Sequence, residues 1–259
     1  MTAKGHDVEP GRGDTERAPR SPLRMGVIAA IGLVLTVCLL ALGWWQVERR
    51  AWKHGLVARV DARIHAAPVA APGPEAWPVG ADTDEYRRVT VTGTFDHSRE
   101  TLVQALTALG GGFWVMTPLA TDQGFTVVVN RGFVPSDRRD AASREQGEIA
   151  GRTTVTGLLR LTEPGGGFLR SNDPAGDRWY SRDVSAIAAA RSLSGTVAPY
   201  FIDADATPNP GGLPVGGLTV VRFPDNHLSY ALTWFALAIG MAGCTIFVLR
   251  HEAGRRRRA

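Results

Sequence analysis

Cysteine is scarce in this chain: 259 residues contain only two, Cys38 and Cys244, and both lie in apolar stretches near the ends. The residues between those stretches contain none, so they can form neither an internal disulfide nor a Cys-x-x-Cys redox or copper site. Several classes of oxidoreductase and copper chaperone are thereby excluded. We interpret the two thiols as packing or lipid-facing side chains.

Catalytic constellations are also scarce. No histidine between the apolar stretches has a partner at the spacing of a metal-ligating pair such as His-x-x-x-His. Asp96-His97-Ser98 is not a catalytic triad, because triad members meet in space and not as chain neighbours, and we interpret it as a turn after a strand. The glycine runs at 110–112 and 165–167 lack the Lys-Ser/Thr of a phosphate-binding loop. We therefore expect no enzyme.

Charge is absent from residues 25–47 and from residues 228–249. As helices, these stretches would each be roughly 33 Å long, enough for a hydrocarbon core of about 30 Å. We predict two transmembrane helices. Ala41-Leu42-Gly43 resembles a signal-peptide cleavage site, but the apolar run exceeds the usual length of about 7 to 15 residues, which favours an uncleaved anchor.

The net charge of +4 could suggest nucleic-acid binding, but clusters of basic residues lie beside these two stretches. This placement indicates topology signals and contacts with anionic lipid, and not nucleic-acid binding. Arg250 and Arg255–Arg258 follow the second stretch, whereas Arg222 stands nearly alone before it. The positive-inside rule then predicts a multi-pass protein of the inner (plasma) membrane, with both termini cytoplasmic and the central domain extracytoplasmic.

The central residues have the period-two alternation and β-branched content of strands. Asp183 is a candidate N-cap for a short helix over 183–192. Thr121-Asp122-Gln123-Gly124 has the composition of a hairpin turn. The strand candidates are 86–95, 113–119, 125–130, 153–161, 200–203 and 218–223.

The predicted fold class is a membrane protein whose two transmembrane helices flank an α+β, mainly antiparallel β extracytoplasmic domain. Whether the sheet closes into a barrel is left open. The expected segments are a disordered basic tail over 1–24, transmembrane helices over 25–47 and 227–249, an amphipathic helix over 48–66, a Pro-rich linker over 67–84, a β-rich domain over 85–226 and a basic tail over 250–259.

His227 is the most informative single residue, because it lies at the start of the second apolar stretch. Imidazole is a good axial ligand for haem iron, and Tyr230 and Trp234 would lie on the same helix face to pack a flat macrocycle. Arg222, together with Arg49 and Arg50, could pair with haem propionates. An interfacial histidine among belt aromatics, with no ligand, is the alternative.

The order of short motifs between the two apolar stretches resembles the Surfeit-locus-1 family over about residues 42–238. Each motif is weak alone, but their order and spacing are specific. They are Leu42-Gly43-x-Trp45-Gln46-Val47-x-Arg49-Arg50-x-Trp52-Lys53, Glu85-Tyr86-Arg87, Gly93-x-Phe95-Asp96-His97, Val129-Asn130-Arg131-Gly132-Phe133-Val134-Pro135, Leu161-Thr162-Glu163, Asn172-x-Pro174, Trp179-Tyr180-x-Arg182-Asp183, Phe201-Ile202-Asp203, Gly216-Gly217 and Asn226-His227-Leu228-x-Tyr230-Ala231-Leu232-Thr233-Trp234.

The resemblance implies an assembly factor for haem-copper cytochrome c oxidase that binds haem a transiently and aids its insertion into the catalytic subunit. It points to His227 as the iron ligand. The expected partners are the oxidase's catalytic subunit, the haem a synthesis machinery and the lipid bilayer. The alternative is a haem-free scaffold that stabilises an oxidase subunit. The candidate partner-contact residues are Trp45, Gln46, Arg49, Arg50, Lys53 and Arg131.

Overall fold

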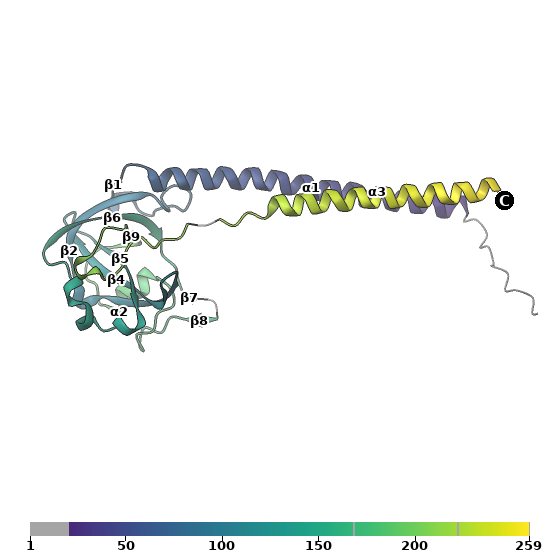
Figure 1. The fold of residues 1–259 in the computed structure, drawn as a ribbon. Helices are drawn as coiled ribbons and strands as arrows, with labels where there is room; N and C mark the ends of the chain where they lie inside the picture. Colours follow the sequence, from purple (N-terminus) through teal and green to yellow (C-terminus); the bar gives the residue numbers. More distant parts are fainter. Residues whose placement is uncertain (1–20, 168, 222, 259) are drawn as a thin grey trace, which may run out of the picture. The chain divides into compact units, whose positions relative to one another are not determined.

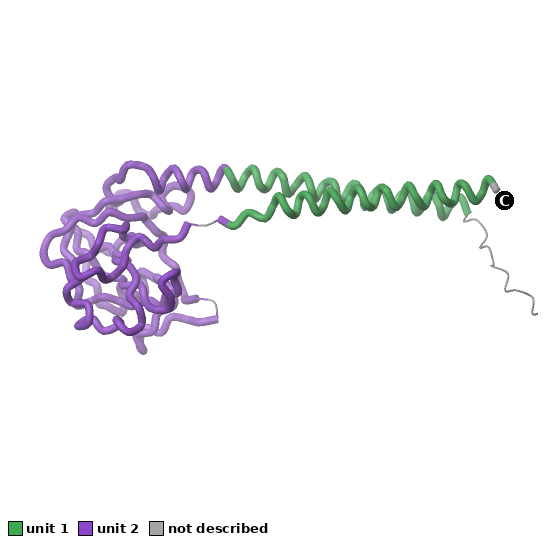
Figure 2. The backbone as a smooth tube through the Cα atoms, viewed as in Figure 1, with its two compact units in different colours: residues 1–54, 224–259 green, residues 55–223 purple. Residues whose placement is uncertain are grey.

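The computed structural model describes residues 21–167, 169–221 and 223–258. The chain divides into two compact units, which Figure 2 colours separately: residues 1–54 with 224–259, here called the helix-pair unit, and residues 55–223, here called the barrel domain. The tail expected over residues 1–24 lies outside the described residues as far as residue 20.

Two long helices, α1 (Pro22–His65) and α3 (His227–Arg258), stand at the two ends of the chain and contain its charge-free stretches. Each is long and apolar enough to cross a membrane by length and composition. Helix α1 runs without a break from Pro22 to His65, so the expected apolar helix and amphipathic helix are one element. Pro68 follows shortly after its end, where a proline cannot continue the helix.

Within the helix-pair unit, α1 and α3 pack antiparallel (Figure 1). Their least exposed positions alternate in steps of three and four, the pattern of a coiled-coil seam. Gly43 of α1 lets the ring of Phe235 approach closely, because a Cβ there would lie 2.6 Å from that ring. The seam positions are Gly32, Thr36, Leu39, Gly43, Gln46, Arg50 and Lys53 on α1, and His227, Ala231, Trp234, Ala238, Met241 and Thr245 on α3.

The barrel domain is built on one seven-stranded sheet in the order β1-β2-β6-β9-β5-β4-β3, with β2 also paired to β4. The β2–β4 pairing closes β2, β6, β9, β5 and β4 into a barrel. A two-stranded sheet, β7–β8, lies apart. The strands are β1 (Val69–Ala70), β2 (Arg88–Phe95), β3 (Thr101–Thr107), β4 (Gly110–Thr121), β5 (Thr126–Pro135), β6 (Arg152–Leu161), β7 (Gly166–Gly167), β8 (Arg170–Ser171) and β9 (Val197–Ala204).

Closure takes place at Gly93, which pairs with Thr153 of β6 on one side and Thr121 of β4 on the other. A Cβ at this position would lie 2.2 Å from the carbonyl oxygen of Ala120, so only glycine lets the strands approach this closely. Antiparallel pairing prevails, as expected, but β5–β9 and β1–β2 are parallel. The sheet-rich domain between two apolar terminal helices is therefore confirmed, with a mixed barrel.

Short helices complete the domain. Helix α2 (Val184–Ala190) begins where predicted, and the carboxylate of Asp183 accepts a hydrogen bond from the backbone N–H of Ala186 at 3.1 Å. The turn at Thr121–Gly124 joins β4 to β5 as a hairpin, and Asp96-His97-Ser98 follows β2 as a turn, as expected. The 3₁₀ helices are η1 (Pro74–Ala76), η2 (His97–Arg99), η3 (Ser136–Arg138), η4 (Ala141–Gly147) and η5 (Pro210–Gly212).

Two apolar cores hold the barrel domain. One fills the barrel and includes Leu119, Leu159 and Tyr200. The other lies between α2 and the opposite face of the sheet, and includes Trp179 and Ile187. Side chains of adjacent β9 residues therefore enter different cores, as the alternation of a strand requires.

Two expectations about local structure are wrong, and one strand was missed. Residues 67–84 are not a free linker, because β1 pairs with β2 and Trp77 packs edge-on against Phe125. The strand expected over 218–223 is absent from its described residues, which contact the sheet through the Thr219 side chain and not through a backbone ladder. Strand β3 was not predicted, because half-buried Leu102 and exposed Leu106 are as apolar as the buried Val103 and Ala105, so the sequence shows no apolar–polar alternation.

We predict that Leu159→Ala lowers the free energy of unfolding by about 2–5 kcal/mol, because this leucine is fully buried in the barrel and its truncation leaves a cavity. Leu106→Ala is the matched control: that side chain is 88% exposed, so the change should stay within about 0.5 kcal/mol. Urea unfolding of the detergent-purified protein measures both. Equal losses for the two variants would contradict this assignment of the core.

Candidate functional site

His227 is the first residue of α3, and both its backbone and its ring are held in place. Its backbone N–H donates to Asp225 Oδ1 at 3.0 Å, which caps the helix. Its ring Nδ1 lies 2.7 Å from Oε1 of Gln46 on α1. An amide oxygen only accepts hydrogen bonds, so Nδ1 donates and the neutral ring keeps its lone pair on Nε2. Within the described residues, Nε2 has no hydrogen-bond partner.

Basic side chains of α1 surround Asp225, two residues before His227. His54 Nε2 lies 2.7 Å from Asp225 Oδ2, and Arg50 Nε lies 3.4 Å from the same oxygen. Lys53 donates to the carbonyl of Pro224. The hydrogen bond from His54, followed by that from the His227 backbone, holds the pKa of Asp225 below its ordinary value of 3.8. These contacts fix the segment that leads into α3 against α1.

The residues expected to pack a macrocycle beside His227 differ in their burial. Trp234 lies in the seam, half-buried, but Tyr230 is 56% exposed and takes no part in it. The three positions share one side of α3 by helical spacing, but the seam takes His227 and Trp234 and leaves Tyr230 outside it. Arg222 lies outside the described residues.

The expected partner-contact residues fall into two groups. Trp45 is 53% exposed, and Arg49 is exposed with its guanidinium 3.9 Å from the centroid of the Trp52 ring. These outward side chains are available to a partner or to lipid. The other residues of α1 in this set, Gln46, Arg50 and Lys53, already contact α3 or the segment before it.

Arg131, the remaining residue of that set, lies on β5 and is only 2% exposed. Because this side chain is buried, it cannot contact a partner directly while the domain is folded. The expectation that Arg131 is a partner-contact residue is therefore wrong. In the sequence, Arg131 directly follows residues 127–130, which are three valines and an asparagine. Nothing in that pattern predicted that the barrel would bury the arginine.

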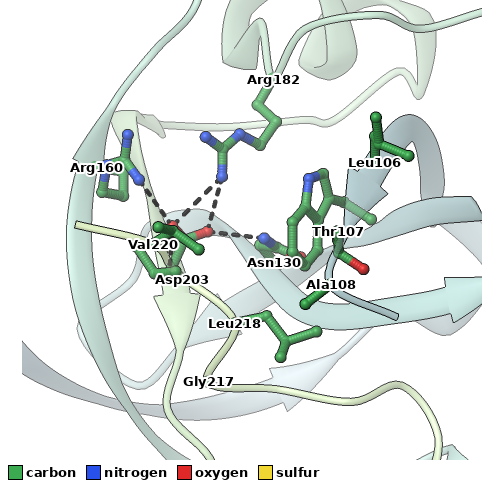
Figure 3. A pocket seen from close by; sticks show the side chains of 12 residues that line it. Leu106, Thr107, Ala108, Asn130, Arg160, Arg182, Asp203, Gly217, Leu218 and Val220 are labelled. Atoms are coloured by element: carbon green, nitrogen blue, oxygen red, sulfur yellow. Dashed lines mark hydrogen bonds and ion pairs between the residues drawn. The ribbon is translucent and has the colours of Figure 1, made fainter. Parts of the chain in front are cut away.

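A second polar site lies in the barrel domain, where a cavity of about 420 Å³ opens beside β5, β6 and β9 (Figure 3). Asp203, 2% exposed, is at its centre. Its carboxylate accepts hydrogen bonds from Asn130 Nδ2 at 2.8 Å, Arg182 Nη1 at 3.1 Å, Arg160 Nη1 at 3.1 Å and Thr219 Oγ1 at 3.0 Å. All four donors converge on one buried charge, which is therefore well compensated.

Glu163 extends this network at the cavity's edge. Arg182 Nε donates to Glu163 Oε2 at 3.1 Å, and Arg160 lies 3.8 Å from Oε1. Burial alone would raise the pKa of Glu163, but the hydrogen bonds and charge of Arg182 outweigh it and hold that pKa below 4.5. The charges of Arg160 and Arg182 thus balance those of Asp203 and Glu163. These contacts join β6, β9 and the residues before α2.

The sequence motifs contain several members of this network without revealing it. Asn130, Glu163, Arg182 and Asp203 each stand in a different motif, and Arg160 stands in none. The one signal was a carboxylate directly after the apolar Tyr200-Phe201-Ile202 of a strand, which predicts a buried charge in need of partners. The partners themselves are distant in sequence.

Comparison with known proteins identifies the family. The model of the SURF1 family matches residues 33–239. Surfeit locus protein 1 of Homo sapiens is 37% identical over 223 residues, covering 80% of this chain and 72% of that protein. Surfeit locus protein 1 of Rattus norvegicus is 37% identical over 221 residues, with 79% and 70% covered. The chain belongs to the SURF1 family.

The SURF1 match covers both sites just described. It begins inside α1 and ends inside α3, so Gln46, Asp225 and His227 fall within it, as does the network around Asp203. A SURF1-like protein of Monosiga brevicollis is 35% identical over 238 residues, covering 86% of this chain and 88% of that protein. The family therefore extends over the apolar helices as well as the barrel domain.

In this SURF1-family chain, we predict that His54→Ala raises the pKa of Asp225 toward 3.8, because the imidazole is the largest contribution that lowers it. A depressed carboxyl pKa means that Asp225 stabilises the folded state above pH 3.8, and that this contribution is lost as the pH falls through the folded-state value. A ¹³C NMR titration of aspartate carboxyls measures the shift. His65→Ala is the control, since that ring contacts Asp61; equal effects would refute the assignment.

Proposed function

We propose that this SURF1-family chain is a membrane-bound assembly factor for haem-copper cytochrome c oxidase. In this proposal it holds haem a transiently at His227 and passes it to the oxidase's catalytic subunit. The single observation that supports the haem step most directly is the hydrogen bond between His227 Nδ1 and Gln46 Oε1, at 2.7 Å. Family membership supports the wider assembly role.

The residues at the start of α3 fit an iron ligand. In metal-ligating histidines the second ring nitrogen is usually hydrogen-bonded, which fixes the tautomer and the ring orientation and raises the basicity of the ligating nitrogen. Gln46 supplies that bond and leaves Nε2 for the metal. Within the described residues, no group of three or more His, Cys, Asp or Glu side chains could hold a bare metal ion. A porphyrin brings four nitrogen ligands of its own, so one imidazole suffices.

The side chains around His227 would orient such a ligand. Trp234 lies seven residues along the same seam, so its ring is on the His227 side of α3. Of the two arginines of α1 expected to meet propionates, Arg50 is engaged with Asp225, which leaves the exposed Arg49 for that role together with Arg222. Bound haem a would supply the iron and the apolar macrocycle; the chain supplies one axial nitrogen and an apolar helix surface.

A carrier of this kind has no catalytic step, in keeping with our expectation that the chain is not an enzyme. Release to the oxidase needs only a higher affinity at the acceptor, and about 1.4 kcal/mol gives a tenfold preference. One axial histidine with a single neutral hydrogen-bond partner is a modest holding site. The catalytic subunit, with more iron ligands, would bind the haem more tightly, so transfer to it would lower the free energy.

The two apolar helices support a membrane location. In the proposed topology α1 and α3 cross the inner (plasma) membrane, both termini are cytoplasmic and the barrel domain is extracytoplasmic. The basic residues at the C-terminal end of α3 favour this orientation. The antiparallel packing of α1 on α3 agrees with two crossings in opposite directions.

A haem-free scaffold is the second candidate, and the exposed aromatic and basic side chains of α1 favour it. Trp44, Trp45 and Trp52 are each more than half exposed, and Arg49 lies over Trp52. Aromatic and arginine side chains are enriched at protein interfaces, so this face suits an oxidase subunit. In this version His227 and Gln46 only join the two helices.

The first test is haem a retention in protein purified from cells that make haem a. We predict that His227→Ala lowers the Soret absorbance per protein at least several-fold, because the axial ligand is lost. Gln46→Leu should give an intermediate loss, since it removes the hydrogen bond to Nδ1 and leaves Nε2 in place. His251→Ala is the matched control, a histidine near the other end of α3.

Circular dichroism must show equal helix content in all variants. Equal Soret spectra for the parent and His227→Ala would eliminate haem binding at this residue. The scaffold version would then survive if the catalytic subunit still co-purifies with both proteins.

The second test concerns topology. We predict that reporter enzymes active only outside the cytoplasm are active when fused within residues 70–220, whereas a cytoplasmic reporter is active at the C-terminus. The reason is that the arginines at the C-terminal end of α3 favour the cytoplasmic side of the membrane. The reverse pattern of activities would overturn the proposed orientation and, with it, the extracytoplasmic site.

A further inference from the structure

Arg131 is a buried cation without an ionic partner. It lies on β5 and is 2% exposed, although arginine is almost never fully buried unless it is paired. Within the described residues, no carboxylate lies within ion-pair distance of it. Burial lowers its pKa to about 10, which still leaves the guanidinium charged at neutral pH. Burying a charge without an ionic partner raises the free energy of the folded state. A negative group beside Arg131 would lower it again.

Among the described residues, the Arg131 side chain makes no hydrogen bond to a carboxylate. Nη1 faces His97 Nδ1 at 3.4 Å, and Nη2 donates to the carbonyl of Gly147 and to Asn209 Oδ1 at 2.9 Å. Nε is buried without an acceptor among the described residues. The ring of Phe95 lies 5.1 Å from the guanidinium carbon and closes another side. The contacts orient the guanidinium but do not neutralise it.

The nearby carboxylates are committed elsewhere. Glu100 accepts from Arg144 Nη1 at 3.0 Å, so its charge is bonded to that second buried arginine and acts on Arg131 only without contact, raising the pKa of Arg131. Asp205 accepts from the backbone N–H of Thr207 at 3.0 Å and from its hydroxyl at 2.6 Å. Glu148 is exposed, and its charge reaches Arg131 only at a distance. The contrast with Asp203, which has two arginines in direct contact, is clear.

A cavity of about 120 Å³ lies against Arg131. A single water needs roughly 10–15 Å³ on this measure, so the space exceeds one water several-fold and suits a small anion. Its walls include Phe95, Asn209 and the stretch Thr153–Thr156 of β6, and Asp205 stands on one side with its carboxylate already bonded. The cavity lies wholly within the barrel domain.

We propose that this cavity binds a small oxyanion, a carboxylate or an inorganic phosphate, with Arg131 as its counter-charge. Among the described residues, Nε has no acceptor and neither Nη atom bonds to a carboxylate, which leaves the charge of the guanidinium for the anion to compensate. The anion would complete the barrel domain by compensating its buried cation. This inference goes beyond haem handling and does not depend on it, since His227 and Gln46 belong to the helix-pair unit.

Thermal unfolding of the full-length, detergent-purified protein tests the proposal. Potassium phosphate, sodium acetate and sodium chloride are compared at equal ionic strength. We expect phosphate, acetate or both to raise the Tm of the parent by about 2–4 °C once the anion exceeds its Kd several-fold, relative to chloride. A response to phosphate alone or to acetate alone identifies the anion. Arg131→Met should abolish the rise, and Arg131→Lys should keep part of it.

Arg152→Gln is the matched control, because Arg152 is an exposed arginine of β6 that pairs with Asp122. It should respond to the anion as the parent does. Equilibrium dialysis of the parent with labelled phosphate and labelled acetate gives the stoichiometry, and it decides the question even where Arg131→Met does not fold. No anion-specific Tm rise and no stoichiometric binding by the parent would overturn the proposal, as would an undiminished rise in Arg131→Met.

Discussion

The packing of α1 against α3 is the constraint on which the candidate site depends. Two residues 181 positions apart, Gln46 and His227, meet only because small residues let the helices approach along one seam. That contact sets the imidazole tautomer and directs the free nitrogen away from Gln46. The same seam holds the basic residues of α1 around Asp225, so the entry into α3 is fixed at several points.

Two buried charges of the barrel domain, Asp203 and Arg131, have opposite surroundings. Asp203 receives donors from both arginines, an amide and a hydroxyl, and needs nothing more. Among the described residues, Arg131 donates to no carboxylate, and it lies beside a cavity. A satisfied network rigidifies a fold, whereas a buried group with an incomplete environment is where a ligand can gain most. The domain thus combines a structural ionic core with a buried arginine that bonds to no carboxylate among the described residues.

Periodicity predicted much of the fold correctly. The long apolar runs became α1 and α3, and the alternating segments at 86–95, 113–119, 125–130 and 153–161 all overlap strands. Asp183 predicted its helix cap, because that bond forms within four residues. Prediction failed where a segment depends on distant partners: Trp77 became ordered by packing on Phe125, and 218–221 lies beside a cavity instead of joining the sheet.

The sequence by itself determined the class of the protein, its two apolar ends and His227 as the residue of interest, since hydropathy, turn chemistry and motif order are local properties. Only the tertiary structure decided that the sheet closes through β2 and β4, that Gln46 orients His227, and that Arg131 is buried while Tyr230 is exposed. Each of these depends on which distant segments come together. That choice is made by the packing of whole surfaces, and no short stretch of residues encodes it.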